Sequence, residues 1–244
     1  MSIKNQIPFK WQSKTFALLF FGFILFTVIG TLTHECGHYL VARYFGYTGG
    51  RIGYGYTFSG KNETWEPFRK VWQRYRTEIK NGTDFPGKQE FETEREKYSK
   101  ENFMIEAGGP LETVLTGTIG LLLLIIFRQK FFDSNQLNLW QWLIIFITLF
   151  WLRGTFNFIC RFGFYLVTGN KPIGNDEFNL SLYLGLGIWT LSITSAIIGA
   201  LVLTFVILKI IPIRQRFTFI CAGLSGGLSG AVLWLGVVGP RIMP

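Results

Sequence analysis

The sequence predicts an all-α integral membrane protein, a polytopic helical bundle of about five spans with a small, mostly polar loop region. Two observations predict this fold class. The apolar residues are gathered in long blocks instead of being spread along the chain as a soluble core needs, and several Trp and Tyr residues stand near block ends. A bilayer core needs roughly 20 apolar residues per helix, and amphipathic aromatic rings favour its two interfaces.

Five blocks are long and apolar enough to be spans. They contain few charges, and more polar stretches separate them. The first block follows basic residues, as the core of a signal peptide does, but it is longer than such a core usually is, so we expect it to be retained. The blocks are residues 16–33, 111–127, 137–152, 178–211 and 217–238.

The longest polar segment predicts three elements. Gly, Tyr and apolar residues alternate over residues 51–58, which indicates a short β-hairpin. Residues 64–80 place aromatic side chains at helical spacing among Arg and Lys, which is typical of a helix on a membrane surface; the alternative is a small soluble subdomain packed on the rest. Residues 87–102 are nearly all polar and predict a solvated helix.

These predictions divide the chain into four parts. The first is a span that carries the motif described below, the second is the polar loop, and the third holds the remaining spans of the functional core. The fourth contains packing spans, in which Gly residues recur at four-residue intervals as they do where helices approach closely. The parts are residues 1–46, 47–106, 107–186 and 187–244.

The formal net charge of +9 points to an anionic partner. The basic residues cluster near span ends and in the polar loop, so the expected partner is the headgroup region of the lipid bilayer, and no nucleic acid is expected. The three Cys residues are widely spaced and predict no disulfide framework.

The chain has two histidines, His34 and His38, and both stand at the end of the first apolar block. Residues four positions apart lie on one face of a helix, so both imidazoles can bind one metal ion. Glu35 points about a third of a turn away, where it can reach a water molecule on that metal. Zinc suits such a site because it accepts nitrogen and carboxylate ligands in tetrahedral geometry and lowers the pKa of a bound water to about 7.

A catalytic zinc needs a third protein ligand, and no third histidine exists. Cys36 lies on the wrong face of the helix. Asp176 stands at the entrance to a long apolar block, just after Pro172 and Gly174, which would open the backbone. The candidates near apolar blocks are Cys36, Glu106, Glu112, Cys160, Asp176 and Glu177.

The segment from His34 to Gly46 resembles the first motif of the site-2 protease family of intramembrane metalloproteases. The shared features are the His-Glu-x-x-His pattern, Gly37 before the second histidine, and the tail in which Ala42 and Arg43 precede Gly46 by a fixed interval. The resemblance extends over roughly residues 16–186.

Two further motifs are similar to those of this family and depart from them in part. Residues 107–111, Ala-Gly-Gly-Pro-Leu, resemble the family's Gly-Pro-x-x-Asn, but Thr113 stands at the position of the Asn. The third family motif places a metal-binding Asp after an Asn and a Pro and usually before a Gly. Asp176 matches it, whereas Glu177 replaces the Gly.

The resemblance implies an intramembrane zinc metalloprotease whose substrate is a membrane protein. Its Zn²⁺ ligands would be His34, His38 and Asp176, and Glu35 would be the general base. The family Asn has a role in binding the oxyanion or positioning the substrate. Here Thr113, Asn157 or Asn175 would have to supply it.

Two other functions remain open from the sequence. A catalytically inactive relative would keep the fold and bind membrane proteins, and the departures at Thr113 and Glu177 allow this. A small transporter would use Arg153, Arg161 and Glu112 along a solute path, but it leaves the zinc motif unexplained. Glu35→Gln separates the first two functions, because only a protease should lose activity while keeping its zinc.

The expected location is a bacterial cytoplasmic membrane, which the chain crosses several times. Lys4, Lys10 and Lys14 place the N-terminus in the cytoplasm by the positive-inside rule. Family members that begin directly with the motif-bearing span face the other way, with the site open to the cytosol. The sequence does not predict an oligomeric state.

Overall fold

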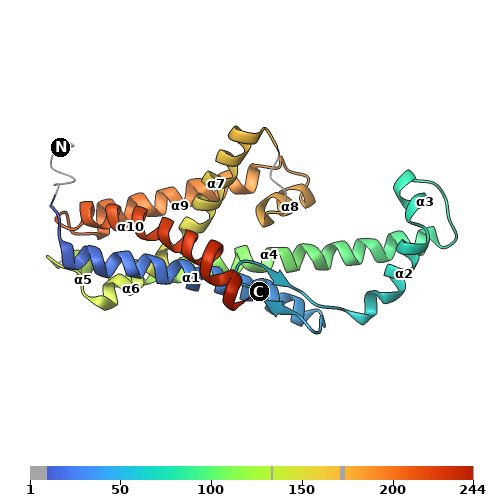
Figure 1. Cartoon of the computed structure of the whole chain (residues 1–244), viewed down its shortest axis with the longest axis horizontal. Helices are drawn as coiled ribbons and strands as arrows, with labels where there is room; N and C mark the ends of the chain where they lie inside the picture. The colour runs from blue at the N-terminus through green and yellow to red at the C-terminus, as the bar shows by residue number, and fades with distance from the viewer. Residues whose placement is uncertain (1–9, 133, 171–173, 244) are drawn as a thin grey trace.

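The computed structural model describes residues 10–132, 134–170 and 174–243, and it confirms the predicted all-α, multi-pass fold. Five helical segments are long and apolar enough to cross a membrane, and Figure 1 shows them running mostly along one direction. Lys4 and Pro172 lie outside the described residues. The segments are Ser13–Tyr44, Lys88–Ile126, Leu139–Thr168, Thr190–Ile210 and Arg216–Ile242.

The helical segments are divided into named elements. The first two spans are α1 (Ser13–Tyr44) and α4 (Lys88–Ile126). The third consists of α6 (Leu139–Thr148), a 3₁₀ turn (Leu149–Trp151) and α7 (Leu152–Thr168). The others are α9 (Thr190–Phe205) with Val206–Ile210, and α10 (Arg216–Ala231) with Val232–Val238 and α11 (Gly239–Ile242); the short helices are α2 (Glu66–Arg74), α3 (Arg76–Asn81), α5 (Arg128–Phe132) and α8 (Asp176–Tyr183).

Helix α1 lies at the centre of the bundle and packs mainly against α10 and α4. The small residues of α10 explain the first contact, because a Cβ at Gly226 would lie 2.6 Å from the Phe20 carbonyl oxygen and one at Gly230 would lie 2.9 Å from Thr27 Oγ1. Gly227 meets nothing within 4 Å. The glycine repeat of the last span therefore serves helix packing through the face that contains Gly226 and Gly230.

Helices α1 and α4 touch through their backbones. A Cβ at Gly37 would clash with the carbonyl oxygen of Gly108, and a Cβ at Gly108 would lie 2.6 Å from the carbonyl oxygen of Gly37. Two facing glycines let helices approach more closely than any pair of larger residues. This crossing places residues 105–113 of α4 directly behind the histidines of α1.

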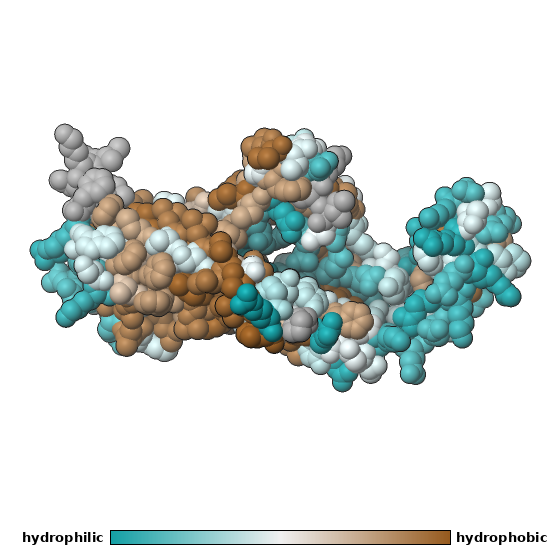
Figure 2. Space-filling view, in the orientation of Figure 1, coloured by the Kyte–Doolittle hydropathy of each residue, from teal (hydrophilic) through white to brown (hydrophobic). Residues whose placement is uncertain are grey.

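Helix α4 is longer than the bilayer is thick. Its 39 residues span about 58 Å at 1.5 Å per residue, roughly twice the hydrocarbon thickness. The sequence predicted a solvated helix and a separate span here, whereas the structure joins them into one helix. Figure 2 shows the resulting division between a brown, apolar part and a teal, polar end.

The polar end is built from α2, which packs on the first half of α4, and from α3, which packs on α2. Phe68 stacks on Phe91 at a ring distance of 4.9 Å and on Tyr98 at 5.3 Å. The indole nitrogen of Trp65 donates a hydrogen bond of 2.7 Å to Glu101. The aromatic face predicted for residues 64–80 thus packs against protein, as the subdomain alternative requires, and the helix is interrupted at Tyr75.

The predicted hairpin at residues 51–58 is present. Strands β1 (Arg51–Ile52) and β2 (Thr57–Phe58) pair antiparallel, with Ile52 opposite Thr57. Contacts between both strands and α1 hold the hairpin against the helix that carries the histidines.

Two predicted span boundaries were wrong. The third span does not end at Leu152, since α7 continues to Thr168 and carries Arg153 and Asn157 within a helix. The fourth begins at Thr190 and not at Phe178. The apolar sequence hides a break after α8, where Gly185 adopts a left-handed conformation (φ +68°).

Candidate metal centre

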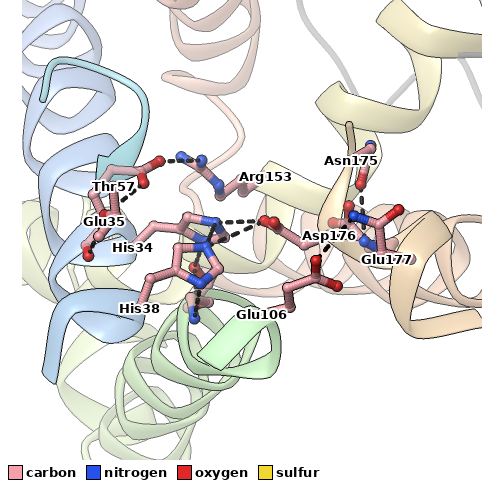
Figure 3. A network of polar contacts seen from close by, with 12 residues as sticks. His34, Glu35, His38, Thr57, Glu106, Arg153, Asn175, Asp176 and Glu177 are labelled. Carbon is pink, nitrogen blue, oxygen red and sulfur yellow. Dashed lines mark hydrogen bonds and ion pairs between the residues drawn. The ribbon is translucent and has the colours of Figure 1, made fainter. Parts of the chain in front are cut away.

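His34, His38 and Asp176 bring three donor atoms together where α1 meets α8. The Nε2 atoms of the two histidines are 3.2 Å apart, and Oδ2 of Asp176 lies 3.0 Å from that of His34 and 3.4 Å from that of His38. Figure 3 shows the two imidazoles and the carboxylate pointing toward one another. The group could hold a metal ion.

The spacing of these atoms fits a tetrahedral ion. Bonds of 2.0–2.2 Å at tetrahedral angles place neighbouring ligand atoms about 3.3 Å apart. The three observed separations, 3.0 to 3.4 Å, agree with that value. The donor set leaves a fourth tetrahedral position without a ligand, as a catalytic zinc site requires.

The other nitrogen of each imidazole is held by α4. Thr113 donates a hydrogen bond of 3.1 Å to the Gly109 carbonyl, so its hydroxyl oxygen accepts the Nδ1–H of His34 at 3.0 Å. His38 donates its Nδ1–H to the carbonyl oxygen of Ile105 at 2.7 Å. In the neutral rings both Nε2 atoms therefore present lone pairs to the centre, which is the tautomer that binds metals.

Three electron-pair donors that face one another at this distance require a positive charge between them. A metal ion supplies it, and the other arrangement these distances allow is a proton between an imidazole and Asp176. Burial opposes ionisation of that carboxyl, but hydrogen bonds and charge from His34 and His38 hold the pKa of Asp176 well below its usual value. The centre contains a carboxylate in either case.

Gly109 leaves the space in which an ion would lie. A Cβ at this position would clash with Nε2 of His38 and lie 2.6 Å from Nε2 of His34. Its neighbour Gly108 touches the backbone of α1, so α4 could move back only by giving up this contact. The centre is thus bounded by two imidazoles, one carboxylate and a bare stretch of helix backbone.

Glu35 is buried beside the centre and is held from two sides. Its Oε2 accepts a hydrogen bond of 3.0 Å from Thr57 of the hairpin, and the same hydroxyl lies 2.8 Å from the Glu35 carbonyl. Nη2 of Arg153 lies 3.9 Å from its Oε1. In Figure 3 the carboxylate points toward Thr57 and Arg153 and is not part of the donor triangle.

The three residues predicted to bind the oxyanion or position the substrate have other partners. Thr113 bonds His34, as described above. Asn175 caps α8, because its Oδ1 accepts the backbone N–H of Glu177 at 2.9 Å. The amide of Asn157 hydrogen-bonds the Glu177 carboxylate, whose pKa is raised chiefly by burial.

Of the six candidate third ligands, Asp176 is the one whose carboxylate lies beside the two histidines. Within the described residues, Glu106 instead accepts a bond of 3.2 Å from Asn179, and Glu112 accepts one of 2.8 Å from Thr116. Cys36, Cys160 and Glu177 are not part of the cluster. Gly174, which precedes the ligand, has a positive φ of 75°, so the predicted opening of the backbone is observed at that residue.

Four contributors to the site were not predicted. Ile105 acts through its carbonyl oxygen, which no residue pattern reveals. Gly109 appeared only as part of a motif and Thr57 only as part of a hairpin. Arg153 carried a usable signal, because an ionisable residue inside an apolar block usually has a functional partner.

If the centre holds a metal ion, Thr113→Val should weaken its binding by about 10- to 100-fold, the usual cost of losing a partner that orients a metal-binding imidazole. The substitution keeps the side-chain shape and removes the oxygen that accepts the His34 Nδ1–H. A competition titration with a chelator measures the affinity. Thr118→Val on the same helix is the control, because its hydroxyl bonds only the Val114 carbonyl; equal affinities in both variants would contradict the assigned role.

No family model matches the chain, and the comparisons with curated proteins and with solved structures found no match either. The molecule is therefore described from its own residues. It is a multi-pass helical membrane protein in which His34, His38 and Asp176 form a group that could hold a metal ion.

Proposed function

We propose that this protein is an intramembrane zinc metalloprotease that hydrolyses peptide bonds of membrane-spanning or membrane-associated proteins, in a bacterial cytoplasmic membrane. The observation that carries the proposal is the convergence of two imidazole nitrogens and one carboxylate oxygen at 3.0 to 3.4 Å, with Glu35 adjacent. Two nitrogens and one oxygen at tetrahedral spacing suit zinc, whereas calcium and magnesium prefer six or more oxygen ligands.

His34, His38 and Asp176 would hold the ion. When bound, zinc would polarise the scissile carbonyl and lower the pKa of a water molecule to about 7. Thr113 and Ile105 contribute by keeping both imidazoles in the required orientation. This orientation does not depend on a bound metal, because α1 and α4 are in backbone contact at Gly37 and Gly108.

Glu35 would carry the proton. It accepts a proton from the attacking water while the water oxygen bonds to the carbonyl carbon and the carbonyl π pair moves onto the oxygen. When the C–N bond breaks, Glu35 returns that proton to the leaving nitrogen. Thr57 binds Oε2, so Oε1 is the atom that would receive the proton.

The position of the site supports a membrane substrate. His34 and His38 follow directly after the apolar run at residues 16–33, so the centre lies near the end of a span, where water can approach. A substrate that is itself a helix shields its peptide bonds by internal hydrogen bonds. It must therefore unwind at the site before Glu35 can direct water to its carbonyl carbon.

A non-catalytic relative that binds membrane proteins is the second candidate. Two observations favour it: Thr113 is engaged with His34, and the Glu35 carboxylate is held by Thr57 near Arg153. It would keep the metal as a structural element. The Glu35 substitution described in the Discussion distinguishes the two functions.

Metal analysis of the purified protein tests the proposal. We expect roughly one zinc ion per wild-type chain and a loss of that zinc in Asp176→Ala, because a site with two ligands binds zinc far more weakly. Glu177→Gln is the matched control, since it changes the neighbouring buried acid and should retain zinc. A metal-free wild type would refute the proposal, and stoichiometric zinc in Asp176→Ala would move the third ligand to Glu112 or Glu177.

A further inference from the structure

Arg153 lies beside the metal centre with few partners for its charge. It is the second residue of α7 and lies within the membrane-spanning segment Leu139–Thr168, where an arginine is costly and usually serves a function. Its Nη1 is 3.4 Å from the Gly30 carbonyl oxygen and its Nη2 is 3.9 Å from Glu35. Charge-assisted hydrogen bonds are normally 2.7–2.9 Å long, so both contacts are loose.

The guanidinium retains unused donors. It carries five N–H bonds in a planar fork, and within the described residues its buried Nε has no partner. The charges of Glu35, Asp176, Glu177 and Glu112 all act on it. Figure 3 shows the guanidinium between the Glu35 carboxylate and Asp176, next to the imidazoles.

Peptide hydrolysis at this centre requires a hydrogen-bond donor for the carbonyl oxygen of the substrate. Attack on the carbonyl carbon turns the carbonyl oxygen into an oxyanion, and a donor aimed at it typically contributes about 10²–10³ in rate. Thr113 stands behind the His34 ring, bonded to Nδ1 on the side away from the donor triangle. Asn157 is bonded to the Glu177 carboxylate. Asn175 uses its Oδ1 to cap α8, and Figure 3 shows it beyond Asp176, on the side away from the imidazoles.

We propose that Arg153 donates hydrogen bonds to the developing oxyanion of the scissile carbonyl. This inference rests on the proposed protease function and adds the residue that stabilises its transition state. Arg153 transfers no proton to the oxyanion, because the guanidinium stays protonated throughout and only donates hydrogen bonds through its N–H groups. The carbonyl oxygen gains the π electron pair and would accept hydrogen bonds from the Arg153 guanidinium, which lies between Glu35 and Asp176.

A purely structural role for Arg153 makes different predictions. If it only balanced the carboxylates around it, its loss would destabilise the site and lower zinc content. An oxyanion donor leaves zinc and substrate affinity nearly unchanged and lowers kcat, because its interaction forms mainly in the transition state. Arg153→Lys separates charge from geometry, since it keeps the charge and loses the fork.

The test measures cleavage of fluorescein-labelled casein by the full-length protein in detergent, together with binding of a phosphonamidate dipeptide that mimics the tetrahedral oxyanion. We expect Arg153→Gln to lower kcat by about 10²–10³, with KM and zinc content nearly unchanged, and to weaken phosphonamidate binding by a similar factor. Arg153→Lys should recover only part of both. Arg161→Gln, about two turns along the same helix, should match the wild type.

The outcomes separate this inference from the proposed function. If wild type cleaves casein in a Glu35-dependent manner and Arg153→Gln keeps its kcat, the oxyanion role is wrong and the protease stands. A loss of zinc in Arg153→Gln, or an effect confined to KM, also overturns the role. If casein is not cleaved, phosphonamidate binding decides alone, and equal affinities in wild type and Arg153→Gln refute the inference.

Discussion

Replacing Glu35 by Gln should abolish peptide hydrolysis and leave the bound zinc in place. Removing a general base costs about 10²–10⁴ in rate, and a Gln cannot accept the proton of the attacking water. The substitution preserves the site, because the amide oxygen of Gln can still accept the hydrogen bond from Thr57. Glu35 is not one of the three clustered donors, so zinc content should match the wild type.

The measurement is casein cleavage with parallel elemental analysis of the same samples. Glu90→Gln, an exposed position on α4, controls for the loss of one negative charge. A protein that only binds membrane partners would show no cleavage in either form and unchanged zinc. Equal cleavage by wild type and Glu35→Gln would show that the activity does not arise from this centre.

Gly109→Ala should eliminate zinc binding while the helical bundle stays folded. The added methyl would lie within 2.6 Å of both Nε2 atoms, where the proposed ion would bind, and it could retreat only if α4 gave up its backbone contact with α1 at the preceding residue. Ala favours a helix by up to about 1 kcal/mol over Gly, so the helix itself gains stability. Loss of metal would then reflect blocked space and not unfolding.

Zinc content, cleavage and circular dichroism together measure this effect. Gly227→Ala is the control, because a Cβ there meets nothing within 4 Å, and it should keep zinc and activity. Full zinc occupancy in Gly109→Ala would mean that the ion binds elsewhere than between these imidazoles.

The sequence predicted the features that depend on neighbouring residues. Apolar blocks indicated the spans, because the bilayer demands a fixed length, and the four-residue interval between His34 and His38 indicated a shared face of one helix. Boundaries set by single backbone conformations were missed. The break at Gly185 is an example, because its flanking residues are as apolar as a span.

Features that depend on tertiary contact were only partly predictable. Asp176 lies 142 residues from His34 in sequence, and only the likeness to a known motif singled it out among six candidates. Thr113 was predicted to bind the oxyanion or position the substrate, and in the structure its hydroxyl contacts His34. Arg153 and Thr57 come to Glu35 from separate parts of the chain, and no local pattern relates them.

Under the proposed function, the glycine crossing of α1 and α4 also limits the directions from which a substrate could enter. Because the two backbones touch at Gly37 and Gly108, this seam has no side chains that could swing aside, and parting it would pull both imidazoles off their anchors. Asp176 belongs to α8, and it is the most exposed ligand of the three, with 32% of its side chain accessible. Under the proposed function, a substrate would therefore reach the centre from the side of Asp176, because the α1–α4 contact closes the other side.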